Sequence, residues 1–134
     1  MTLHRLWWAL GCLLVAAAVV VCLVPGKELP NAFELNDKVS HMAGHGALAM
    51  YFSGLVARRG WWKIFVFLLL FGAGIEYAQY AMHAGREGDP RDVLANSAGA
   101  AIGLAFAWAG VSRWPELAAW WRPCGKFPIR RRRG

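Results

Sequence analysis

Long apolar runs are the feature that most limits how this chain can fold. The first run, residues 7–24, contains 18 residues without a single charge. A helix needs about 20 predominantly apolar residues to cross the hydrocarbon core of a bilayer. Further apolar runs cover residues 40–57, 61–82 and 92–111, with polar segments between them. The sequence therefore predicts an all-α fold, an integral membrane four-helix bundle with short loops.

Composition supports a membrane protein over a soluble one. The 134-residue chain is 57% hydrophobic and only 17% charged, whereas soluble domains average about 45–50% apolar and about 25% charged residues. The formal net charge of +7 raises the alternative of nucleic-acid binding. The basic residues mostly flank the apolar runs, however, and no recognition helix or basic-aromatic surface is visible. We therefore expect no nucleic-acid partner.

The first apolar run has a signal peptide as its main alternative interpretation. The hydrophobic part of a signal peptide is about 7–15 residues long and ends at a small-residue cleavage site. Residues 7–24 are longer than that, and Pro25 and Gly26 follow without such a site. We interpret the run as a retained transmembrane helix. The chain has three cysteines, and they are not closely spaced. They therefore give no sign of a disulfide framework or of a metal site.

Small residues are frequent in the second and fourth runs. In the fourth run a small residue recurs at every fourth position, namely Ala95, Gly99, Gly103 and Ala107. This spacing places all four on one helix face, where small side chains let two backbones approach closely. Residues 40–57 are the least apolar run and are also rich in glycine and alanine. We expect both runs to form helices that are packed among other helices.

The distribution of basic residues predicts the orientation in the membrane. With four spans and a cytoplasmic N-terminus, eleven of the fifteen basic residues fall on the cytoplasmic side. The four on the other side are Lys27, Lys38, Arg86 and Arg91. Because cytoplasmic segments carry an excess of Lys and Arg, we expect a multi-pass protein with both termini in the cytoplasm. Residues 1–112 form the membrane domain in this scheme, and residues 113–134 form a basic cytoplasmic tail.

Polar and ionisable residues gather near one end of three predicted helices. In the four-span scheme all of them lie toward the extracytoplasmic face, and within each helix they share one side. Ionisable residues inside membrane segments are costly and often functional. A purely structural polar network that fixes helix register is the alternative. The residues concerned are Asp37, Lys38 and His41; Glu76 and Gln79; Arg86; and Asp92 and Asn96.

These residues have different expected roles. Glu76 and His41 are the candidate catalytic residues because they are titratable and lie within the predicted spans. The other six are candidate ligand-binding residues, among which Asn96 and Gln79 can also brace helices. Asp37 has a simpler alternative role as a helix N-cap. His45 lies one turn deeper than His41, and the sequence leaves open whether it joins the site.

The same residues, in this order, resemble the VanZ-like family of small integral membrane proteins. The resemblance rests on Asp37-Lys38-x-x-His41, Glu76-x-x-Gln79, Arg86 and Asp92-x-x-x-Asn96-x-x-Gly99, and it covers roughly residues 35–108. It implies a membrane protein of the bacterial cell envelope, in the cytoplasmic (inner) membrane, because the namesake of the family is associated with low-level teicoplanin resistance. His45 departs from the pattern, since an aromatic residue such as Tyr is expected there.

Three kinds of function fit this pattern. The first is a protein that binds or modifies a lipid-linked or cell-wall ligand at the outer leaflet, with Arg86 and Lys38 holding its phosphate or carboxylate. The second is an intramembrane hydrolase or transferase that uses Glu76 or His41 as a general base. The third is a small lipid transporter, although no inverted repeat is visible.

Cofactors and partners can also be predicted. We expect no cofactor. A metal site made of His, Asp and Glu is an alternative, since His41 and His45 lie one turn apart. No HExxH-type motif supports it, so we expect no metal. The expected partners are membrane lipids, and the chain can form an oligomer.

Overall fold

The computed structural model describes residues 3–24, 37–82 and 89–115, without the side chains of Leu3 and Asp37. These residues form four α-helices and two short 3₁₀ helices, and they contain no strand. The elements are α1 (Leu3–Leu23), α2 (Asp37–Ser53), η2 (Arg58–Gly60), α3 (Trp61–Met82), α4 (Pro90–Trp108) and η3 (Val111–Arg113). The predicted all-α class is therefore confirmed.

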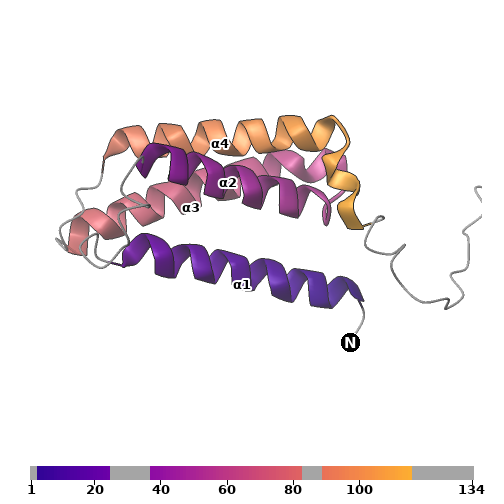
Figure 1. Ribbon diagram of the computed structural model, residues 1–134, viewed down its shortest axis with the longest axis horizontal. Helices are drawn as coiled ribbons and strands as arrows, with labels where there is room; N and C mark the ends of the chain where they lie inside the picture. Colours follow the sequence, from indigo (N-terminus) through magenta and orange to yellow (C-terminus); the bar gives the residue numbers. More distant parts are fainter. Residues whose placement is uncertain (1–2, 25–36, 83–88, 116–134) are drawn as a thin grey trace, which may run out of the picture.

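The four helices lie lengthwise beside one another and alternate in direction (Figure 1). One end of the molecule therefore holds the starts of α1 and α3 together with the ends of α2 and α4. The opposite end holds the starts of α2 and α4 and the end of α3. This alternation brings three groups of polar residues, distant in sequence, to the same end of the molecule.

Glycines allow α2 and α4 to pack with their backbones almost in contact. A Cβ atom on Gly99 would collide with the carbonyl oxygen of Met42, and one on Gly103 would collide with that of Gly46. In the other direction, a Cβ on Gly46 would lie 3.1 Å from the carbonyl oxygen of Gly99. The small-residue face predicted for the fourth run is thus the face that packs on α2, as expected for close helix pairs.

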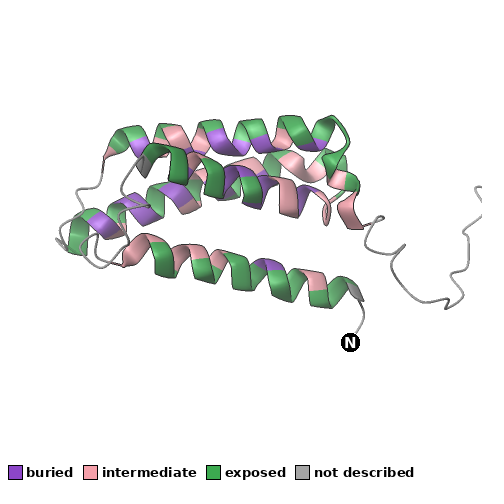
Figure 2. Ribbon diagram, viewed as in Figure 1, coloured by how far each residue is buried: buried purple, intermediate pink, exposed green. Residues whose placement is uncertain are grey.

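The apolar core lies between α2, α3 and α4, and α1 packs against its side. Figure 2 shows that most of α1 is exposed, whereas the other three helices each bury one face. Gly11 allows a close approach of α1 to α2, because a Cβ there would lie 2.8 Å from the ring of Phe52. The buried core side chains are Leu48, Ala49, Phe52, Ile64, Leu68 and Ala100.

Aromatic residues hold the start of α1 against the end of α2. The hydroxyl of Tyr51 donates a 2.8 Å hydrogen bond to the carbonyl oxygen of Trp7. The ring of Trp114 stacks on Tyr51 and meets the edge of Trp7, with ring centres 5.0 Å apart in both pairs. These contacts join α1, α2 and the residue after η3. They lie at the end of the molecule that carries Arg5, Arg58 and Arg113, which we call the basic end.

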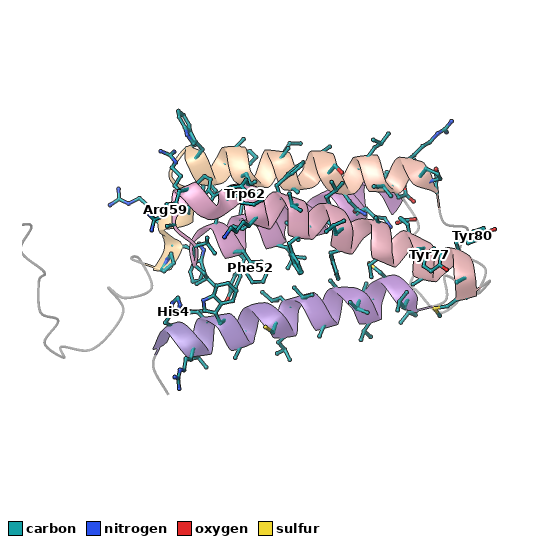
Figure 3. The ribbon with its side chains drawn as sticks, turned by 180° about the vertical axis from the view of Figure 1, so that it is seen from behind. His4, Phe52, Arg59, Trp62, Tyr77 and Tyr80 are labelled. Atoms are coloured by element: carbon teal, nitrogen blue, oxygen red, sulfur yellow. The ribbon has the colours of Figure 1, made fainter. Side chains whose placement is uncertain are left out.

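Exposed aromatic and basic side chains mark the two ends of α3. Tyr77 and Tyr80 project near its last turns, and Arg59 and Trp62 project at the opposite end (Figure 3). Tyr and Trp are enriched where a membrane protein meets the two membrane–water interfaces. Large apolar side chains such as Leu13, Leu70 and Leu94 are exposed on α1, α3 and α4. This surface is typical of a protein in contact with lipid.

Two helical segments among the described residues are long and apolar enough to cross a membrane. They are His4–Leu23 and Arg58–Met82. The other two helices are shorter or less apolar: the 17 residues of α2 span about 26 Å and the 19 residues of α4 about 29 Å, at 1.5 Å per residue. Two helices of this kind, together with the exposed apolar surface, are compatible with a membrane protein.

The helix bounds differ from the predicted runs at several ends. The third run, residues 61–82, coincides with α3. The second run was expected to reach residue 57, but α2 ends at Ser53, because the amides of Gly54 and Leu55 bond three residues back and tighten the last turn. The fourth run begins two residues earlier than predicted, at Pro90. Beyond Pro115, the predicted basic tail lies outside the described residues.

Candidate functional site

Polar side chains from α2, α3 and α4 meet at the end where α2 and α4 begin. Lys38 and His41 lie in the first turns of α2, and Glu76 lies in the last two turns of α3. Asp92 and Asn96 lie in the first turns of α4. All of these except Lys38 are buried. We refer to these five residues as the polar cluster.

Lys38 forms the outer part of the polar cluster. Its Nζ donates to Oδ2 of Asp89 at 3.0 Å and to Oδ1 of Asp92 at 2.8 Å. The Lys38 side chain is 48% exposed, whereas the side chain of Asp92 is only 6% exposed. The ammonium thus links the surface to a buried carboxylate and neutralises part of its charge.

His41, Glu76 and Asn96 form the buried part of the polar cluster. Nδ1 of His41 donates to Oδ1 of Asn96 at 3.2 Å, because an amide oxygen can only accept. Nε2 of the same ring lies 3.8 Å from Oε1 of Glu76. The other Glu76 oxygen, Oε2, accepts from the backbone N–H of Asp89 at 3.2 Å. Asn96 therefore orients the imidazole so that its second nitrogen faces the carboxylate.

A second polar layer lies one helical turn deeper. Nδ1 of His45 donates to the carbonyl oxygen of His41 at 3.2 Å. Nε2 of His45 and Nδ2 of Asn96 have no hydrogen-bond partner among the described residues. A Cβ on Gly72 would lie 2.7 Å from Nδ2 of Asn96 and 3.1 Å from Nε2 of His45. Gly72 thus lets two buried polar groups pack directly against the backbone of α3.

Not every predicted site residue joins the polar cluster. The amide of Gln79 donates to the carbonyl oxygen of Cys22 at 2.8 Å and so ties α3 to α1. Gln79 therefore contacts a neighbouring helix and not the polar cluster, and its role as a helix brace stays a prediction. The side chain of Asp37 and the whole of Arg86 lie outside the described residues.

Two contributors to this region were missed by sequence reasoning. Asp89 is the N-cap of α4, accepts from the backbone N–H of Arg91 and pairs with Lys38. The pair Asp89-Pro90 was a usable signal, since Asp is favoured at the N-cap and Pro at the first helical position. Gly72 carried no comparable signal, because glycine is common in membrane helices for many reasons.

The charge on Asp89 makes stability depend on pH. The N–H of Arg91 and then the ammonium of Lys38 hold the pKa of Asp89 below its ordinary value, which is about 3.9. The ionised Asp89 side chain therefore stabilises the fold at pH values above its pKa in the unfolded chain. This stabilisation is lost as the pH falls through the pKa of Asp89 in the folded protein, because the carboxylate becomes protonated.

Asp89→Asn tests this effect, because Asn caps a helix about as well as Asp but carries no charge. We expect the variant to melt below the wild type at neutral pH, and the gap to close as pH falls below about 4. Thermal melting of both proteins in detergent across that pH range is the measurement. A gap that does not change with pH would contradict the role of the charge.

An apolar cavity lies away from the polar cluster. It has a volume of about 500 Å³ and lies between α1, α2 and α3 near the basic end, with Trp8, Cys12, Phe52 and Phe67 in its wall. Lys63 stands among its lining residues. Because its wall is almost entirely apolar, the cavity suits a hydrocarbon group. None of the residues of the polar cluster lines it.

Comparison with known proteins gives one match. A family model described as VanZ/LLP1 matches residues 7–112, which include the polar cluster and all four α-helices except for the first residues of α1. Searches of the curated proteins and of the solved structures gave no match.

Proposed function

Because the chain belongs to the VanZ/LLP1 family, we propose that it is a multi-pass protein of the bacterial cytoplasmic membrane that acts on the cell envelope. In this proposal the polar cluster faces outward and binds or modifies the polar part of an envelope or lipid-linked ligand. Membrane lipids surround the helices, and the apolar cavity holds a hydrocarbon chain of such a lipid. A contribution to teicoplanin resistance is the cellular role that we propose.

The charge at the two ends of the bundle supports the outward orientation. The end opposite the polar cluster carries Arg5, Arg58, Arg59, Lys63 and Arg113. The described basic residues at the cluster end are Lys38, which pairs with two carboxylates, and Arg91. Because Lys and Arg accumulate on the cytoplasmic side, this asymmetry favours four spans with both termini in the cytoplasm.

One observation carries the proposal of a binding site. Buried ionisable groups from three helices, His41, Glu76 and Asp92, converge at one level of the bundle. A bundle that needed only to pack would gain more from apolar side chains there, because buried charges are costly even when paired. Convergence of His, Glu and Asp is therefore better explained by ligand binding than by packing.

A hydrolase or transferase is the second candidate function. Its support is the orientation of His41, whose Nδ1 is held by Asn96 while Nε2 faces Glu76 at 3.8 Å. A ring fixed in this way can accept a proton from a hydroxyl or water and pass it to a neighbouring group. In this alternative Glu76 or His41 acts as the general base on the same bound ligand.

Susceptibility of cells to teicoplanin tests the proposed cellular role. The wild type and Glu76→Gln are expressed at equal membrane levels in a susceptible Gram-positive host. We expect the wild type to raise the minimum inhibitory concentration of teicoplanin and Glu76→Gln to lose that increase, because the carboxylate is removed at constant shape. Tyr77→Phe, which changes an exposed neighbour on α3, should keep it.

Two results would count against the proposal in different ways. No increase with the wild type would exclude the resistance role. An increase that Glu76→Gln retains would exclude the polar cluster as its source. Native mass spectrometry of the wild type purified with host lipids tests ligand binding separately, since a lipid-linked ligand should be retained by the wild type and lost from Glu76→Gln.

A further inference from the structure

Three buried side chains in the polar cluster have the composition of a metal-binding site. Nitrogen or oxygen atoms of His41, Glu76 and Asp92, one from each residue, lie within 4.8 Å of one another. The three residues are 6%, 6% and 4% exposed. We propose that they bind a first-row transition-metal ion such as Zn²⁺. The inference deepens the proposed function and rests on it for the role of the ion in the cell.

The spacing of these donors suits one ion. Zinc binds nitrogen and oxygen ligands at about 2.0–2.2 Å, so two donors of a tetrahedral site lie about 3.4 Å apart. The measured distance from Nε2 of His41 to Oε1 of Glu76 is 3.8 Å. Side-chain shifts of about 1 Å or less bring all three donors to metal-ligand distance. Three protein ligands leave one position of a tetrahedral ion open, as in catalytic zinc sites.

Each of the three ligands is also held by an outer contact. His41 is anchored through Nδ1 by Asn96, Glu76 through Oε2 by the backbone N–H of Asp89, and Asp92 through Oδ1 by Lys38. In metal sites such outer hydrogen bonds orient the ligands, and a histidine ligand usually donates its second ring N–H to an oxygen. The contact between His41 and Asn96 has this form and turns Nε2 toward the carboxylate.

The layer beneath the three ligands provides an independent observation. Nε2 of His45 and Nδ2 of Asn96 are buried, lack hydrogen-bond partners among the described residues and pack against Gly72. Asn96 also contacts His41 directly, so this layer adjoins the three ligands. Buried polar groups normally have hydrogen-bond partners. Two polar groups without partners next to the three ligands are the feature expected where a bound water molecule or ligand group supplies the missing hydrogen bonds.

Charge and ligand type indicate which ion would bind. Glu76, Asp89 and Asp92 carry three negative charges and Lys38 carries one positive charge, so the group has a net charge of −2 and balances one divalent cation when His41 is neutral. Imidazole favours zinc, iron, nickel and copper, whereas Mg²⁺ and Ca²⁺ prefer sites made of oxygen ligands alone. We therefore expect zinc to bind, and Mg²⁺ and Ca²⁺ not to bind.

Metal analysis of the purified protein tests the inference. The full chain is purified in detergent with an affinity tag that contains no histidine, stripped with a chelator, dialysed and titrated with Zn²⁺. We expect about one ion per chain by elemental mass spectrometry and a melting temperature that rises with zinc concentration, because an ion that binds only the folded state stabilises it. Mg²⁺ and Ca²⁺ should leave the melting temperature unchanged.

Matched variants locate the ion. His41→Gln and Glu76→Gln should weaken zinc binding by about 100-fold or more, and loss of the outer contact in Asn96→Ala should weaken it by about 10–100-fold. His4→Gln makes the same change at an exposed histidine at the other end of the bundle and should bind like the wild type. Circular dichroism and size-exclusion chromatography establish that each variant is folded.

The inference is overturned if the wild type binds no zinc and zinc does not change its melting temperature. It is also overturned if His41→Gln and Glu76→Gln, when folded, bind zinc like the wild type. The wild-type titration needs no variant, so it decides the matter even if a substitution prevents folding. A protein that alters teicoplanin susceptibility without binding zinc would keep the proposed function and lose only the metal.

Discussion

Gly99→Leu is expected to prevent the bundle from assembling. A Cβ on Gly99 collides with the carbonyl oxygen of Met42 on α2, and that backbone oxygen cannot move without moving the helix. Overpacking a tight interface typically costs about 1–3 kcal/mol and occasionally more. A leucine adds three further carbon atoms to the collision, so we expect the free energy of unfolding to fall by about 3 kcal/mol or more. The measurement is the folded fraction in detergent, from size-exclusion chromatography and thermal melting.

Gly74→Leu is the matched control for this prediction. Gly74 lies in α3, is exposed, and has no atom within 4 Å of its ideal Cβ position. Replacing glycine within a helix gains up to about 1 kcal/mol in helix propensity. Gly74→Leu should therefore be neutral or stabilising. A Gly99→Leu variant that melts at the same temperature as the wild type would contradict the close backbone contact between α2 and α4.

The second large effect is expected at Asn96. Its side chain is 1% exposed and accepts the hydrogen bond from Nδ1 of His41. Asn96→Ala removes a buried acceptor and leaves a cavity between α2, α3 and α4, and the two effects together are expected to destabilise the fold by about 2–4 kcal/mol. Equilibrium unfolding in detergent, followed by tryptophan fluorescence, measures this loss.

The neighbouring residue provides the comparison. The hydroxyl of Ser97 donates to the carbonyl oxygen of Val93 in its own helix. Ser97→Ala removes only this local bond and is expected to change stability by about 1 kcal/mol or less. Asn96→Leu roughly restores the lost volume without the hydrogen bond and separates the two contributions. Equal stability of Asn96→Ala and Ser97→Ala would show that Asn96 does not link the helices.

Much of the fold could be predicted from single residues and their spacing. The apolar runs predicted the four helices, and the third run, residues 61–82, matched α3 at both ends. The repeat that includes Gly99 and Gly103 identified the face of α4 that meets α2. These features are local, because hydrophobicity and helical periodicity act within one segment.

The membership of the polar cluster was harder to predict. Spacing placed Gln79 on the same side of α3 as Glu76, yet its amide donates to α1. The sequence does not determine whether His45 joins the site. Its position beside Gly72 depends on how α2 and α3 pack. A hydrogen bond is satisfied by whichever partner lies within about 3 Å, and periodicity within one helix does not provide that distance.

The sequence by itself determined the helical class, the family and the end of the molecule at which the polar residues gather. Only the tertiary structure decided that His41, Glu76 and Asp92 lie within 4.8 Å of one another. The three positions belong to three helices, so no short motif records their proximity. Their distances depend on how closely the backbones of α2 and α4 approach, and the glycines of that interface set this approach.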